Sequence, residues 1–92
     1  MDSMNLHLCP VCGYDLGFAP WQGLSASDEI CPCCHIQFGY DDCAGGQPEK
    51  RAAIYYDWRT EWIAEGMPWR GSRKLPEGWD PVRQLQAIGV KP

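Results

Sequence analysis

The sequence predicts a small α+β domain, in which three short strands surround two cysteine-containing turns and are followed by one long and one short helix. Three observations lead to this prediction. The chain has 92 residues, which suffices for one compact core but not for two of ordinary size. Its first half contains two CxxC pairs separated by short alternating segments, and its second half has apolar residues at helical spacing. We therefore expect residues 1–92 to form a single domain.

The composition argues against several other classes of protein. The hydrophobic fraction of 45% and the charged fraction of 22% are typical of a globular chain rather than a disordered one. No apolar run approaches the roughly 18 residues of a membrane span, and the N-terminus from Met1 to Met4 lacks the basic start and apolar core of a signal peptide. We expect a cytoplasmic protein with no membrane partner. In such a reducing compartment, paired cysteines favour a metal site over disulfides.

Two cysteine turns are the first elements of the chain. Cys9 and Cys12 form one CxxC pair, Cys31 and Cys34 form the other, and the eighteen residues 13–30 separate them. A gap of two residues lets the backbone curl so that both sulfurs converge on one ion, and a second such turn, or knuckle, completes a tetrahedron. The spacing therefore predicts one metal ion bound by these four cysteines. Zn²⁺ is preferred, with iron as the alternative, because tetrahedral thiolate suits both.

The remaining cysteines and the histidines are expected to lie near the site rather than to bind the ion. With Cys33 as a ligand, the gap from Cys31 would be a single residue and the knuckle geometry would be lost. Cys33 and Cys43 are expected to act as small apolar fillers, although a substitute ligand or a redox pair remains an alternative. His35 follows the second knuckle as Gly13 follows the first, where a positive φ is often needed. His7 is likewise expected to be a neighbour of the site.

Two family resemblances bear on the metal. The stretch Cys9-Pro10-Val11-Cys12-Gly13-Tyr14 looks like the first knuckle of a rubredoxin, and Cys31-Pro32-Cys33-Cys34 resembles the second. The resemblance implies one iron ion and electron transfer. The interval of eighteen residues is shorter than rubredoxins have, and the long C-terminal half has no counterpart there. For these two reasons zinc is preferred.

A closer resemblance covers residues 8–43. The order CPVCGY, then EICPCC, then FGYDD is similar to the small bacterial cysteine-rich CPCC family, although this chain has CPCC in its second knuckle. The resemblance implies a zinc-ribbon-like domain with rubredoxin-type knuckles. It implies no particular reaction.

Short strands are predicted around the knuckles. Residues 14–20 and 24–30 can form a hairpin with 21–23 near its tip, and residues 36–40 alternate in the pattern of a third strand. Three short strands with two knuckles make a three-stranded zinc ribbon, expected over residues 6–43. Asp41-Asp42 then begins a glycine-rich turn, and we interpret this pair as a solvated strand end rather than a second metal site.

A long helix is predicted over residues 48–66. Proline is tolerated at a first helical position such as Pro48, Glu49 suits the positive end of the helix dipole, and Gly66 can stop the helix. An apolar stripe at helical spacing is expected to pack on the ribbon. The stripe consists of Ala52, Tyr55, Trp58 or Arg59, and Trp62.

A short helix is predicted over residues 80–89. Asp80 is a suitable N-cap, Pro81 is suited to the first position, and Gly89 can end the helix. Val82, Leu85 and Ile88 would form its apolar face.

The loop between the helices and the distribution of charge raise the question of nucleic acid. Arg70, Arg73 and Lys74, flanked by Trp69 and Trp79, have the ingredients for stacking bases and contacting phosphates. However, the first 49 residues contain seven acids and no Lys or Arg, the remainder contains eight bases and five acids, and the net charge is −4. Three basic residues release few counterions. Nucleic-acid binding is therefore a second alternative, and we expect the two oppositely charged halves to face each other.

These observations favour a zinc-binding structural module that presents an aromatic surface to another protein. The chain has five tryptophans and four tyrosines, and such residues dominate interface energetics. The first alternative is an iron electron-transfer protein, or a redox sensor whose thiolates respond to oxidants with help from Cys33 and Cys43. An enzyme is not expected and no catalytic residue is predicted, because four cysteines close the coordination shell of zinc.

Overall fold

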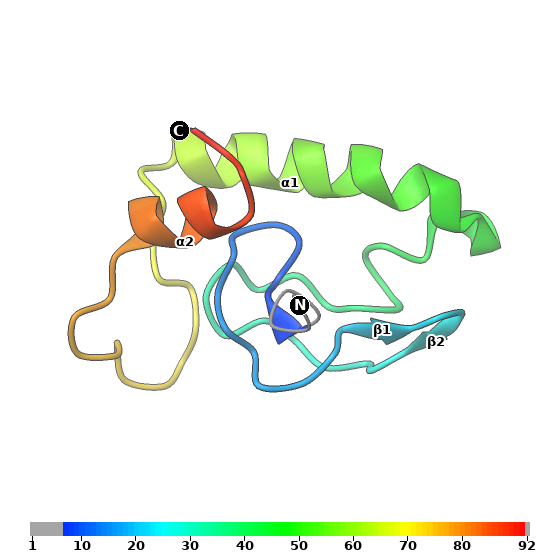
Figure 1. Ribbon diagram of the computed structural model, residues 1–92, viewed down its shortest axis with the longest axis horizontal. Coiled ribbons are helices and arrows are strands. Elements are labelled where there is room, and N and C mark those ends of the chain that lie inside the picture. Colours follow the sequence, from blue (N-terminus) through cyan, green and yellow to red (C-terminus); the bar gives the residue numbers. More distant parts are fainter. Residues whose placement is uncertain (1–6, 92) are drawn as a thin grey trace.

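The computed structural model describes residues 7–91 as a small compact α+β fold (Figure 1). The Cα radius of gyration is 12.5 Å, as expected for a chain of this length. The start of the predicted ribbon at residue 6 and the N-terminal segment 1–4 lie outside the described residues. Neither helix in the described part has the length and apolar composition needed to cross a membrane. The elements in chain order are β1 (Trp21–Gln22), β2 (Ser25–Ala26), the 3₁₀ turns η2 (Ala44–Gly46) and η3 (Pro48–Lys50), α1 (Arg51–Ala64) and α2 (Pro81–Ala87).

The sheet is smaller than predicted. β1 and β2 form an antiparallel hairpin in which Trp21 lies opposite Ala26 and Gln22 opposite Ser25. The predicted strand over 14–20 was therefore wrong in position, since Trp21 and Gln22, expected at the hairpin tip, form β1, whereas β2 lies within the predicted 24–30 but is much shorter. Gly17 turns the backbone with a φ of 80°, and its N–H donates to the Asp15 carboxylate, so residues 14–20 cannot remain extended.

The three-stranded zinc ribbon is not confirmed within residues 7–91. In place of a third strand over 36–40 there is a single bridge, between Ile30 and Gln37. The acidic pair that follows explains the difference. Asp41 Oδ2 accepts from the backbone N–H of Gln37 at 2.8 Å, and Asp42 Oδ1 accepts from that of Gly39 at 2.6 Å. These side chains satisfy N–H groups that a strand ladder would otherwise use, and the chain turns instead.

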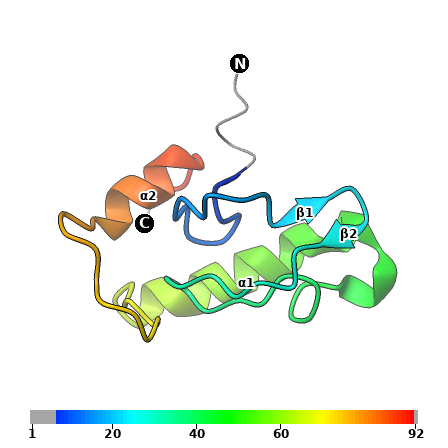
Figure 2. The same cartoon turned by 90° about the horizontal axis from the view of Figure 1, so that it is seen from below.

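Both predicted helices are present. The turn η3 begins at Pro48 and leads directly into α1, whose end is marked by Gly66 with a φ of 94°. The Asp80 carboxylate accepts from the backbone N–H groups of Val82 and Arg83 and so caps α2. Gly89 follows α2 with a φ of 78°. Figures 1 and 2 show α1 along one side of the cysteine turns, and a long loop that returns the chain to α2.

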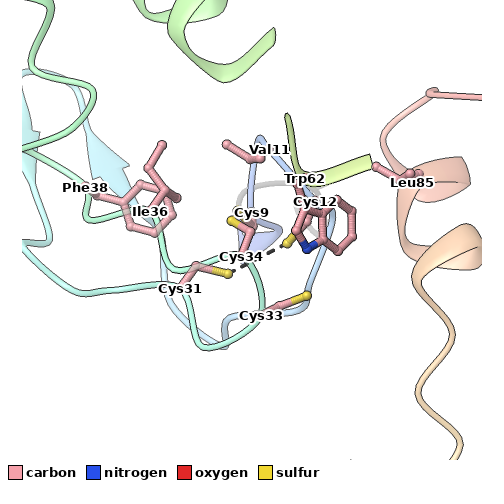
Figure 3. Packing of buried hydrophobic residues seen from close by; sticks show 10 residues of the cluster. All are labelled: Cys9, Val11, Cys12, Cys31, Cys33, Cys34, Ile36, Phe38, Trp62 and Leu85. Carbon is pink, nitrogen blue, oxygen red and sulfur yellow. Dashed lines mark hydrogen bonds between the residues drawn. The ribbon is translucent and has the colours of Figure 1, made fainter. Parts of the chain in front are cut away.

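The core is built around cysteine sulfur (Figure 3). From α1 only Trp62 is fully buried, and from α2 only Leu85. Tyr55, Trp58 and Ile63 of α1 pack against the core while half-exposed. Ala52, predicted to pack on the ribbon, is exposed, because it lies in the first turn of α1 beside a shallow groove. The fully buried residues are Cys9, Val11, Cys12, Cys31, Cys33, Cys34, Ile36, Phe38, Trp62 and Leu85, together with Asp42.

Asp42 joins the hairpin to α1. Its Oδ2 accepts from the indole N–H of Trp21 at 2.8 Å and from the hydroxyl of Tyr55 at 2.7 Å. Burial, followed by the nearby carboxylate, raises the pKa of Tyr55 above its usual range, so this hydroxyl remains a donor at neutral pH. Together with the Gly39 N–H, three donors from three segments meet one buried carboxylate. The acidic pair is thus a structural feature and not the solvated strand end that we expected.

Replacing Asp42 by Asn should destabilise the fold. An amide offers one acceptor oxygen, so at least one of the three donors would face an N–H₂ group. We expect Asp42→Asn to lower the free energy of unfolding by about 1 to 3 kcal/mol, measured by urea denaturation of the metal-loaded protein. Asp41→Asn is the matched control and should cost less, because Asp41 accepts a single backbone hydrogen bond. Equal stability of Asp42→Asn and wild type would contradict this assignment.

Candidate metal centre

The two CxxC turns have the same backbone structure. In the first, the N–H of Gly13 donates to the Cys9 carbonyl at 2.8 Å, and the N–H of Cys9 donates to the Tyr14 carbonyl at 2.8 Å. In the second, His35 donates to Cys31 and Cys31 to Ile36, each at 2.9 Å. Each turn is enclosed at the same offsets by one antiparallel bridge, Leu8 with Asp15 and Ile30 with Gln37. The sequence therefore builds one knuckle twice.

The residue after each second cysteine adopts the predicted conformation. Gly13 has a φ of 83° and His35 a φ of 72°, which confirms the expected positive φ at both places. At Gly13 a side chain would also collide with α2, because a Cβ there would lie 2.0 Å from the Gln84 carbonyl oxygen. Glycine is needed at this position for two reasons, whereas His35 is exposed and needs only the backbone conformation.

The knuckles bring four sulfurs together at the spacing of a tetrahedral metal site. The Sγ atoms of Cys9, Cys12, Cys31 and Cys34 all lie within 4.8 Å of one another. Cys9 and Cys34 are separated by 3.8 Å and Cys12 and Cys31 by 3.7 Å (Figure 3). A tetrahedron with metal–sulfur distances of about 2.3 Å has sulfurs about 3.8 Å apart. A disulfide requires about 2.05 Å, and all four cysteines are free. The cluster could therefore hold a metal ion.

Burial and mutual hydrogen bonding set the protonation of the cluster. Burial raises the pKa of the Cys12 and Cys34 thiols, because an ionised sulfur loses its hydration there. Hydrogen bonds from the neighbouring thiols of the cluster lower the pKa of Cys31. Such a site does not favour four thiolates without a cation, whereas a central divalent ion would stabilise all four.

The other candidate ligands lie outside the cluster. Cys33 is buried beside it, and its sulfur accepts a 3.5 Å hydrogen bond from Gln84 Nε2. Cys43 is exposed, so the expectation that it fills apolar space was wrong. His7 and His35 are both exposed and do not belong to the group of potential ligands.

The carbonyls of both knuckles accept hydrogen bonds from the C-terminal half of the chain. Arg59 of α1 donates from Nε to the Val11 carbonyl at 2.8 Å and from Nη2 to the Pro10 carbonyl at 2.7 Å. Trp58 Nε1 donates to the Cys34 carbonyl at 3.0 Å. Both Trp58 and Arg59 of the predicted stripe therefore make polar contacts with the knuckles, and Trp58 also packs against the core.

The loop after α1 and helix α2 make similar contacts. The backbone N–H of Arg70 donates to the Cys33 carbonyl at 2.9 Å and its Nη1 to the Cys34 carbonyl at 3.3 Å. Gln84 Nε2 donates to the Cys12 carbonyl at 3.2 Å, while Gln84 Oε1 accepts from the indole of Trp79 at 2.7 Å. The knuckles are thereby bonded to α1, to the loop and to α2.

The residues considered for nucleic-acid binding are largely engaged within the fold. Trp69 packs edge-to-face between Tyr14 and Trp79, with ring centroids 5.4 and 5.6 Å away. Its indole N–H donates to the Arg73 carbonyl at 3.0 Å. Arg70 is occupied by the knuckle and by the Glu65 carboxylate. Of the basic residues in this loop, Arg73 and Lys74 remain exposed.

The oppositely charged halves meet through neutral groups rather than ion pairs. Arg59 and Arg70 donate to carbonyls of the N-terminal half, and the Arg51 guanidinium lies 3.4 Å from the ring centroid of Trp21. The one ion pair among residues 7–91 joins Arg70 to Glu65, both from the C-terminal half. The expected facing of the halves is observed, but through carbonyls and an aromatic ring.

Comparison of the chain with protein-family models, with curated proteins and with solved structures found no match. The resemblance to the CPCC family and to rubredoxins stays a prediction. The functional assignment therefore depends on the geometry of the cysteine cluster and its surroundings.

Proposed function

We propose that the chain is a zinc-binding structural module that mediates protein–protein interaction. The single observation behind this proposal is the group of four fully buried sulfurs at tetrahedral spacing. Two knuckles on one ion, with a short hairpin between them, correspond to a smaller version of the zinc-ribbon-like fold that the CPCC resemblance implies. Zinc is proposed over iron because the short interval between knuckles and the long C-terminal half differ from rubredoxins.

A structural role agrees with the coordination chemistry. Catalytic zinc keeps one coordination position for water, whereas four thiolates fill a tetrahedral shell. Each of the four cysteines is also fully buried, so a substrate would not reach the ion. We propose that the metal organises the knuckles and that no reaction takes place there. A cytoplasmic location, where thiols are kept reduced, fits this use of cysteine.

Exposed large side chains support an interaction role. Tyr40 in the turn after the second knuckle is 75% exposed, Leu24 at the hairpin tip 77%, and Tyr56 on α1 63%. Large apolar and aromatic side chains of this kind are common anchors of protein interfaces. We propose another protein as the partner. Nucleic acid is not proposed, because the tryptophans of the basic loop are packed within the fold.

Purification of the full chain from its native cells tests both parts of this proposal. We expect a colourless protein with one zinc per chain by elemental analysis, recovered together with a second protein that mass spectrometry identifies. Replacing both Leu24 and Tyr40 by Ser should release that protein without removing zinc. A red protein with visible absorption and stoichiometric iron would instead indicate electron transfer. Recovery of nucleic acid that dissociates with salt would contradict the choice of partner.

A further inference from the structure

We propose that Arg59, with a smaller share from Arg70, offsets the net negative charge of the complex that the four cysteine thiolates form with a divalent ion. Both arginines are positioning residues rather than ligands. This inference rests on the proposed function, since it concerns the metal site of that module. It adds that the metal centre depends on cationic groups supplied by the C-terminal half of the chain.

The first step is the charge of the centre. Four thiolates around one divalent cation leave two net negative charges, and the surrounding sulfurs are fully buried. Charge in such a site is weakly screened, so it needs compensation from nearby groups. Residues 1–49, which contain all four ligands, include no Lys or Arg. Any lysine or arginine that compensates the centre must therefore come from later in the chain.

Arg59 is placed to provide this compensation. Its guanidinium donates to Pro10 and Val11, the two residues that lie between the ligands Cys9 and Cys12. The side chain is half-buried, and within residues 7–91 its polar contacts are with these carbonyls and not with a carboxylate. Its positive charge is therefore not neutralised by a described acidic partner next to the knuckle.

Arg70 occupies a similar place at the second knuckle but contributes less. Its Nη1 donates to the carbonyl of the ligand Cys34 at 3.3 Å. Its Nη2 donates to the Glu65 carboxylate, and this carboxylate offsets part of the positive charge of Arg70. The side chain of Glu65 is 54% exposed, so solvent screens this ion pair and the remaining charge of Arg70 still acts on the centre.

Neutral donors on the same knuckles show that a carbonyl can be satisfied without a cation. Among the described residues, the amide of Gln84 is the only side-chain donor to the Cys12 carbonyl. At the Cys34 carbonyl, the indole of Trp58 supplies the shorter of two side-chain hydrogen bonds, at 3.0 Å against 3.3 Å from Arg70. The hydrogen bonding of the knuckle therefore does not require a cation such as the Arg59 guanidinium, which donates to Pro10 and Val11. The electrostatic effect on the buried centre distinguishes Arg59 from those two donors.

Charge compensation predicts a measurable preference between oxidation states. Tetrahedral thiolate accepts iron as well as zinc, and the complex of iron with four thiolates has one more net negative charge with Fe²⁺ than with Fe³⁺. Nearby cations stabilise the more negative, reduced centre. When an electrode supplies one electron to convert bound Fe³⁺ to Fe²⁺, loss of the Arg59 charge should therefore move the midpoint potential to more negative values.

The test uses the full chain loaded with zinc or with iron, in wild type and four variants. Arg59→Met removes both the charge and the two hydrogen bonds to the knuckle, and Arg59→Lys keeps the charge. Arg70→Met removes the cation that is expected to compensate less of the charge. Arg83→Met is the control, because Arg83 is an exposed residue of α2. We expect zinc affinity, measured by competition with a chromophoric chelator, to fall about 10- to 100-fold in Arg59→Met and to stay unchanged in Arg83→Met.

The iron potential separates a charge effect from a merely structural one. We expect a negative shift in Arg59→Met, a smaller negative shift in Arg70→Met, and values close to wild type in Arg59→Lys and Arg83→Met. Equal potentials in all variants, or a shift in Arg59→Lys as large as in Arg59→Met, would overturn the inference. If Arg59→Met does not fold, the absence of a shift in Arg70→Met overturns it. Failure of the wild type to bind any metal would instead refute the proposed function.

Discussion

Removal of the metal should unfold this protein. Zinc binding contributes about 10 to 16 kcal/mol of folding free energy in zinc-finger peptides, whereas native domains have a net stability of only about 5 to 15 kcal/mol. The fully buried core contains five cysteines, four of which belong to the cluster, and the sheet is a hairpin with two residues in each strand. Little apolar packing would remain to hold the fold once four sulfurs lose their common ion.

The helices should be lost together with the knuckles. A chain segment as short as α1, with 14 residues, is marginal in water on its own. Its contacts with the knuckles depend on the positions of the Pro10, Val11 and Cys34 carbonyls. When the knuckles disorder, α1 loses these acceptors as well as the surface on which Trp62 is buried.

Circular dichroism with a strong chelator measures this effect. We expect helix content and the thermal transition to disappear on chelation under reducing conditions, and to return when zinc is added. The melting temperature of the wild type should fall progressively as the chelator concentration is raised, because only the folded state binds the ion tightly. A metal-free protein with unchanged helix content and melting temperature would contradict the central role of the cluster.

The features set by neighbouring residues could be predicted from the sequence. Each CxxC turn is closed by hydrogen bonds within six residues, as in Cys9 to Tyr14, so its conformation follows from local spacing. The helix ends at Pro48, Gly66 and Asp80 are likewise local. The knuckles and both helices were therefore correct to within a few residues.

The predicted third strand was wrong because side chains compete with strand pairing for its backbone N–H groups. Alternation over residues 36–40 suggested a strand, but the carboxylates of Asp41 and Asp42 take the N–H groups of Gln37 and Gly39. An acidic pair directly after a short alternating segment that contains a glycine indicates a turn with side-chain hydrogen bonds. This pattern was present in the sequence and could have led to the prediction of a turn over these residues in place of a strand.

The support of the knuckles could not be predicted because it is long-range. Arg59 lies 48 residues from Val11, and Gln84 lies 72 residues from Cys12. The helical spacing allowed either Trp58 or Arg59 as a member of the packed stripe. No neighbouring residue indicates that the Arg59 guanidinium donates to a carbonyl. Such contacts depend on how α1 and α2 dock, which spacing alone does not determine.

Exchange of single cysteines should separate ligand from neighbour within one knuckle. Cys34→Ser should abolish tight metal binding, because a neutral hydroxyl replaces one of four thiolates and leaves the tetrahedron with three. The variant should then unfold as the chelated protein does. Cys33→Ser should retain one metal ion, since its sulfur lies outside the four-sulfur group and accepts only a 3.5 Å hydrogen bond from Gln84. Its cost should be about 1 kcal/mol of stability.

The two substitutions are matched controls for each other, because they make the same chemical change at adjacent buried positions. Zinc per chain by elemental analysis, and affinity by chelator competition, should differ sharply between them. Stoichiometric, tightly bound metal in both variants would refute the choice of Cys34, and loss of metal in Cys33→Ser alone would make Cys33 the ligand. The one-residue gap between Cys31 and Cys33 argues against that second result, because it cannot form the two-residue turn that both knuckles share.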